Sequence, residues 1–180
     1  MKTVGESVQE AIDYMNGGLA QYALVPTVAA LAKTAEKNGI DLSEFIKMNW
    51  DLIAFTGLPQ ALPLPLAIPF GLKKIVPQFN VHHGAPESGL FLVRETLGNG
   101  KIPNNFIFHS SGEFEIEIGV LYLPDSLIFG LLGGVIFDSA NKNESIGDKY
   151  WMHISDFKMF ISELWGRRDL AERIMKFYRE

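Results

Sequence analysis

The sequence predicts an α+β protein, and three observations lead to that class. Helix-start signals and apolar stripes of helical period occupy the first third, residues 3–56. An alternating segment then predicts a hairpin near 113–137, and helical stripes return at 155–179. Because the predicted strands are grouped and do not alternate with helices, α+β is favoured over a doubly wound α/β fold. A chain of 180 residues is expected to form one globular domain over 1–180.

The helical N-terminal third contains the clearest local signals. Thr3 and Glu6 have the spacing of a capping box, in which each side chain satisfies a free amide of the first helical turn. Asp41 and Glu44 repeat this spacing at the start of a third helix. Between them, an apolar stripe within 19–38 predicts the second helix.

A proline-rich apolar strap follows at 57–78. Five of the nine prolines of the chain lie there, interleaved with Leu, Ile and Phe. Proline breaks helices and cannot donate to a sheet ladder, so neither a regular helix nor a central strand is expected. We expect an extended segment that either covers the core or lines an apolar binding site.

The sheet-containing region is predicted at 79–138. Strict alternation at 113–118 places three apolar side chains on one face of a strand and three glutamates on the other. This strand runs on to a turn at 124–126, and the apolar run 127–137 returns as the second, doubly covered strand of the hairpin. With a further strand at 105–109, the sheet is expected to be small and mostly antiparallel.

Two C-terminal helices complete the prediction over 155–179. The second begins near Asp169, which has capping-box spacing to Glu172. The first carries a stripe at helical intervals, formed by Phe157, Phe160, Ile161 and Leu164.

Composition excludes several classes of function. The chain has no cysteine, which removes disulfides, thiolate nucleophiles and cysteine-based metal sites. Its 16 basic and 21 acidic residues give a net charge of −5, which disfavours nucleic acid as a partner. The N-terminus lacks the apolar segment of a signal peptide, so a cytoplasmic protein is expected. The apolar stretch 119–137 contains Pro124 and the end of an alternating pattern, which favours a soluble hairpin over a membrane span.

The adjacent pair His82 and His83 is the first candidate for chemistry. If Pro86 opens a helix, both imidazoles precede its positive end, which favours their neutral, base-competent form. We take His82, His83 and Glu87 as the candidate catalytic residues. The alternative is structural, with one histidine bonded to a backbone carbonyl and the other exposed.

A row of carboxylates on the predicted strand is the second candidate. Glu115 and Glu117 share a strand face, and His109 on a neighbouring strand adds an imidazole, so these three could bind a divalent metal. A solvated outer sheet face explains the same glutamates without any ligand.

The surplus of aromatic residues is the third candidate, with 13 Phe in the chain. Phe carries apolar area without a polar group, so these rings belong in a core, a pocket or an interface. The side chains expected to line an apolar ligand site are Tyr22, Trp50, Phe55, Phe70 and Phe79.

These observations favour a non-catalytic binding or interaction module over an enzyme. Every catalytic motif is weak, whereas the apolar excess is large, so a hydrophobic small molecule or a protein partner is expected in an apolar groove or pocket. The alternative is a metal-assisted hydrolase or lyase built on the His and Glu residues. A third hypothesis is a structural component of an assembly, including a homo-oligomer.

Overall fold

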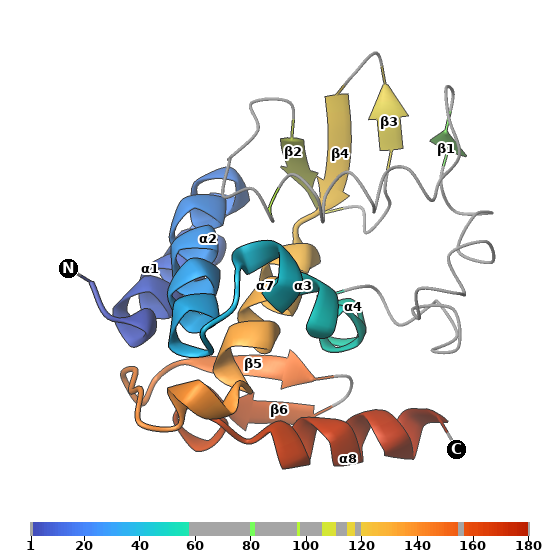
Figure 1. Cartoon of the computed structure of the whole chain (residues 1–180). Coiled ribbons are helices and arrows are strands. Elements are labelled where there is room, and N and C mark those ends of the chain that lie inside the picture. Colours follow the sequence, from blue (N-terminus) through green and yellow to red (C-terminus); the bar gives the residue numbers. More distant parts are fainter. Residues whose placement is uncertain are drawn as a thin grey trace.

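The N-terminal part of the chain is helical, as predicted (Figure 1). The computed structural model describes residues 2–57, 80–81, 97, 106–110, 115–117, 120–154 and 157–179, with backbone alone at 80–81, 115–117, 121 and 179. Residues 58–78 of the strap predicted at 57–78 lie outside these residues, and Gly57 is the last residue of a helix. The helices are α1 (Val4–Asn16), α2 (Ala20–Lys37), α3 (Leu42–Met48) and α4 (Trp50–Gly57).

Local capping sets where two of these helices begin. The Thr3 hydroxyl accepts from the Glu6 amide at 3.0 Å, and the Thr3 amide donates to the Glu6 carboxylate at 2.7 Å, so the predicted capping box is confirmed. Asp41 likewise accepts from the Glu44 amide at 2.7 Å and caps α3. In α2 the helix continues through Pro26.

The described strands confirm the α+β class. A four-stranded sheet has the order β1-β3-β4-β2, formed by Asn80–Val81, Glu115–Glu117, Val120–Pro124 and Phe106–His109 in that order. The β3–β4 pair is antiparallel, whereas β1–β3 and β2–β4 are parallel. The sheet is therefore small as expected, but mixed in direction.

The apolar run after the turn is a helix, so the strand predicted at 127–137 is wrong. A hairpin does lie in this region, but β3 and β4 form it within 115–124, and α7 (Ser126–Ile136) follows at once. A continuous apolar run has no period that separates a buried strand from a buried helix. Nearly every side chain of α7 is buried, which is why it is apolar all round.

Glycines allow α7 to approach α4 closely. A Cβ atom added to Gly130 would lie 2.4 Å from the Ile53 carbonyl oxygen, and one on Gly57 would lie 2.6 Å from the Gly130 Cα. Side chains at these two positions would therefore force the helices apart. Helical glycine costs about 1 kcal/mol relative to alanine, and the packing of α4 on α7 offsets this cost.

Among the described residues of the C-terminal region there is one α-helix, so the helix predicted over 157–164 is wrong. Residues 157–160 form β6 (Phe157–Phe160), which pairs antiparallel with β5 (Trp151–Ile154), and α8 (Arg168–Arg179) follows. The stripe that looked helical combines a strand with the 3₁₀ turn Ile161–Glu163, and the turn happens to bury Ile161 at helical spacing. Figure 1 shows this hairpin and α8 on the side of the helices opposite the four-stranded sheet.

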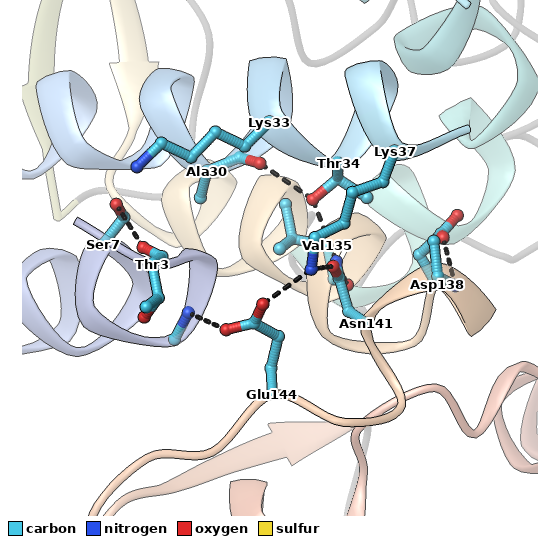
Figure 2. Close-up of polar contacts among 12 residues, drawn as sticks. Thr3, Ser7, Ala30, Lys33, Thr34, Lys37, Val135, Asp138, Asn141 and Glu144 are labelled. Carbon is cyan, nitrogen blue, oxygen red and sulfur yellow. Dashed lines mark hydrogen bonds and ion pairs between the residues drawn. The ribbon is translucent and has the colours of Figure 1, made fainter. Parts of the chain in front are cut away.

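A polar network holds the segment after α7 against α1 and α2 (Figure 2). The fully buried Asn141 amide donates to the Thr34 hydroxyl and to the Val135 carbonyl, both at 2.9 Å. Its oxygen accepts from the Lys37 ammonium at 3.0 Å, and Lys37 also pairs with Glu144 at 2.6 Å. These contacts join α2 to the end of α7 and the segment after it, and the hydrogen bond from the Gly5 amide to Glu144 adds α1.

Glu144 makes the stability of this network dependent on pH. Burial alone would raise the pKa of Glu144, but the Lys37 ammonium and the Gly5 amide, which donates to the carboxylate at 2.8 Å, outweigh burial and lower that pKa. A carboxyl with a lowered folded-state pKa contributes stability above its unfolded pKa, near 4.3, and loses it as pH falls through the folded value. We therefore expect Glu144→Gln to be clearly less stable than wild type at pH 7, with the gap closing below about pH 4. Urea unfolding across this range measures it, and a gap that is constant with pH would contradict it.

The buried apolar side chains form one cluster to which α1, α2, α4, α7, β5 and α8 all contribute. Among the helices of the described residues, none combines the length and apolar composition needed to cross a bilayer.

Candidate ligand-binding pocket

A pocket of about 310 Å³ lies where the helices meet the β5–β6 hairpin, and we name it the β5 pocket. One wall is formed by residues 149–153, that is, the two residues before β5 and the first three residues of β5. The volume is at the lower end of the roughly 300–1,000 Å³ range of ligand pockets. The other wall comes from α1, α4 and α7, through Ile12, Asn16, Thr56, Ser126 and Phe129.

Two hydroxyl groups hold the helical wall together. The Ser126 hydroxyl donates to the Gly57 carbonyl at 2.6 Å and so joins the first turn of α7 to the end of α4. The Thr56 hydroxyl donates to the Leu52 carbonyl at 2.8 Å, within α4. Because the hydroxyl hydrogens are used inside the wall, the groups that remain toward the pocket are mainly apolar, with the Phe129 ring the largest.

Side chains on the strand wall alternate between the core and solvent. Tyr150 and Met152 are buried, whereas Trp151 and His153 are exposed. The Tyr150 hydroxyl donates to the Asp13 carboxylate at 2.8 Å and links the strand to α1. Burial is the main cause that raises the pKa of Tyr150, and the hydrogen bond to Asp13 adds to it, so this phenol stays a neutral donor at ordinary pH.

An exposed aromatic group stands beside the pocket. The Trp151 ring is 42% exposed, the Lys158 ammonium lies 3.9 Å from its centroid, and the His153 ring packs edge-on at 5.1 Å. The contact between an ammonium and an indole face is a cation–π interaction, and it joins Trp151 of β5 to Lys158 of β6.

The pocket lining carries little charge. Among the described residues that line the pocket, Lys149 carries a charge and none is Asp or Glu. The Lys149 ammonium lies 5.0 Å from the centroid of the Tyr150 ring. An uncharged or anionic apolar group therefore suits this site better than a cation.

The residues predicted to line an apolar site lie elsewhere. Trp50 and Phe55 are buried in the hydrophobic core, with the Phe55 ring 6.1 Å from that of Tyr178. Tyr22 is 61% exposed on α2. None of these three lines the β5 pocket, and Phe70 and Phe79 lie outside the described residues.

The candidate catalytic residues His82, His83 and Glu87 also lie outside the described residues. The structure therefore leaves their role a prediction.

The candidate metal ligands come from strands that are not adjacent. Strand β4 lies between β2, which carries His109, and β3, which carries Glu115 and Glu117. Two strand spacings put these backbones about 9–10 Å apart, a separation that does not itself test the site, so metal binding by these residues stays a prediction. In the part of the chain that the structure describes, no group of three or more His, Cys, Asp or Glu residues could hold a metal ion.

Sequence reasoning did not identify the pocket residues that the structure brings together, notably Phe129, Trp151 and Met152. Residues 151–154 alternate between exposed and buried positions in the structure, but the sequence Trp-Met-His-Ile does not alternate between polar and apolar types, so it carried no clear strand signal. No sequence pattern connects this strand to the ends of α1 and α4, because those contacts arise only from packing.

Part of the chain is similar to a known protein family. A protein-family model described as Rv1289 matches residues 93–180, just under half of the chain. The matched stretch includes α7, β5 and β6 and therefore the pocket residues from Ser126 onward, whereas Ile12, Asn16 and Thr56 precede it. No curated protein and no solved structure matches the chain.

Proposed function

We propose that this protein is a non-catalytic binding module that takes up an apolar group in the β5 pocket. The observation that supports this most is a pocket of about 310 Å³ whose exposed lining is mainly apolar and whose described lining residues include no Asp or Glu. Phe129 and Met152 supply apolar surface, and Trp151 offers an aromatic face at the side of the pocket. Pockets of this kind gain affinity from apolar area and orientation from a few polar groups.

An anionic aromatic dye, anilinonaphthalene sulfonate, tests the proposal. We expect one saturable site on the full chain, because the dye combines an apolar ring system with a negative charge that Lys149 can attract. Phe129→Ala removes the largest ring of the helical wall and should weaken binding about tenfold. Dye fluorescence titrations measure both affinities.

Phe177→Ala is the matched control. Phe177 is 70% exposed on α8 and does not line the pocket, so this variant should bind the dye as wild type does. Near-ultraviolet circular dichroism of each variant shows that the dye reports a folded state, since loosely packed states also bind it. Equal weakening by both substitutions, or no saturable site on wild type, would overturn the proposal.

The two other hypotheses have no comparable support. A metal-assisted hydrolase would rest on His82, His83 and Glu87, outside the described residues, or on His109 with glutamates two strands away. Assembly into a homo-oligomer remains a prediction from composition.

A further inference from the structure

The β5 pocket runs along an edge of β5. Side chains of a strand point alternately to its two faces, so a pocket on one face meets every second residue. Here all residues from 149 to 153 line the pocket, including buried Tyr150 and Met152 and exposed Trp151 and His153. The pocket must therefore flank the strand, where both sets of side chains and the backbone between them can be reached.

The hydrogen-bond pattern identifies which backbone groups face that edge. The Ile161 amide donates to the Tyr150 carbonyl at 3.1 Å, and β5 pairs antiparallel with β6 in the same register. In such a pair every second residue bonds to the partner strand, so Met152 and Ile154 also bond to β6. The amide and carbonyl groups of Trp151 and His153 then point away from β6.

This second edge of β5 has no strand beside it among the described residues, because the sheet there is the two-stranded β5-β6 pair. Within the same residues, no backbone hydrogen bond to Trp151 or His153 is found outside that pair. The backbone amide and carbonyl groups of Trp151 lie about 7 Å from those of His153, which is the two-residue repeat of an extended chain.

We infer that the β5 pocket receives an extended peptide segment of a partner protein, which adds a strand to the free edge of β5. This inference rests on the proposed function of the pocket. The segment's backbone bonds to Trp151 and His153, and its alternate side chains enter the apolar space against Phe129 and Met152. The pocket lies between a strand edge and a helical wall, and its volume of about 310 Å³ has room for one or two side chains but not for a folded domain.

Charge complementarity restricts which sequences the partner segment can have. Lys149 stands at the start of the strand wall, Lys158 lies beside Trp151, and none of the described lining residues is Asp or Glu. The partner segment is therefore apolar at alternate positions and carries an acidic side chain or a C-terminal carboxylate at the end that lies near Lys149.

A displayed library of random octapeptides, selected on the immobilised full chain, tests the inference. We expect enrichment of sequences with alternating apolar residues and an acidic end. A selected peptide is then synthesised unmodified, N-methylated at its odd positions, and N-methylated at its even positions. Because alternate amides of a strand point to the same edge, methylation of one set should weaken binding at least about tenfold and the other set much less. Fluorescence polarisation measures the three affinities.

Hydrogen exchange gives a second readout that needs no variant. In the free protein the amides of Trp151 and His153 should exchange rapidly, while those of Met152 and Ile154 are protected by β6. The peptide should protect the first pair and leave the second unchanged. Protection of Trp151 and His153 in the free protein would overturn the inference, as would no enriched peptide or equal tolerance of both methylated forms.

The dye experiment distinguishes a failure of the strand-addition inference from a failure of the proposed binding function. Dye binding that depends on Phe129, without peptide binding, would overturn strand addition and leave a small-molecule pocket. Loss of the dye site would overturn the proposed function itself.

Discussion

Replacing Gly130 with alanine is expected to destabilise the protein by about 3 kcal/mol, at the upper end of overpacking effects. The added methyl group would lie 2.4 Å from the Ile53 carbonyl oxygen and 2.7 Å from the Gly57 Cα. Both neighbours are backbone atoms, so no side chain can rotate away, and α4 and α7 must separate. Urea unfolding monitored by circular dichroism measures the loss.

Gly17→Ala is the matched control for this substitution. Gly17 ends α1, and a Cβ atom there would lie 3.5 Å from its nearest neighbours, an ordinary contact. This change should leave stability within about 1 kcal/mol of wild type, because it alters mainly the entropy of the unfolded chain. Gly57→Ala disturbs the same α4–α7 contact. The double variant with Gly130→Ala should therefore lose less free energy of unfolding than the two single variants lose together. Additive losses, or equal effects of Gly17→Ala and Gly130→Ala, would contradict the close helix contact.

Replacing Asn141 with alanine is expected to cost about 2–3 kcal/mol. The fully buried amide makes three hydrogen bonds, to Thr34, Val135 and Lys37, and alanine satisfies none of them. The loss combines unsatisfied buried polar groups with the release of the chain segment that carries Glu144. Chemical unfolding measures the loss in free energy.

Asn143→Ala tests the same residue type on the same loop, at an exposed position, and should change stability by less than about 0.5 kcal/mol. Thr34→Val removes the hydroxyl that accepts from Asn141. The double variant with Asn141→Ala should then show a coupling energy of at least about 0.5 kcal/mol. Zero coupling would mean that the Asn141–Thr34 hydrogen bond adds nothing to stability.

The sequence predicted helix starts well and the identity of apolar segments poorly. The caps at Thr3 and Asp41 were recognisable because an N-cap depends on residues three positions apart. The α+β class followed from the grouping of elements, and it is confirmed. Residues 127–137 were predicted as a strand, because burial on all sides removes the periodicity that separates strand from helix. The stripe at 157–164 was predicted as a helix, because a strand followed by a 3₁₀ turn can imitate helical spacing.

The pocket was beyond prediction from the sequence. Apolar ligand contacts were expected at Trp50 and Phe55, which the core takes up instead. Large aromatic residues fill cores and pockets alike, so composition cannot assign them to one or the other. The pocket residues come from three helices and a strand that meet only through packing.

By itself, then, the sequence determined the mixed class, the capped helix starts and an apolar surplus that favours binding over catalysis, because each depends on composition or on neighbours within one turn. Tertiary structure alone decided that α7 is the buried central helix, because only the glycine contact with α4 and the cover on every side make a helix of that run. It also decided which residues line the β5 pocket. Among the described residues β5 pairs along one edge, with β6, and its pocket faces helices α1, α4 and α7, whose contacts with β5 are distant in sequence and are encoded by no local pattern.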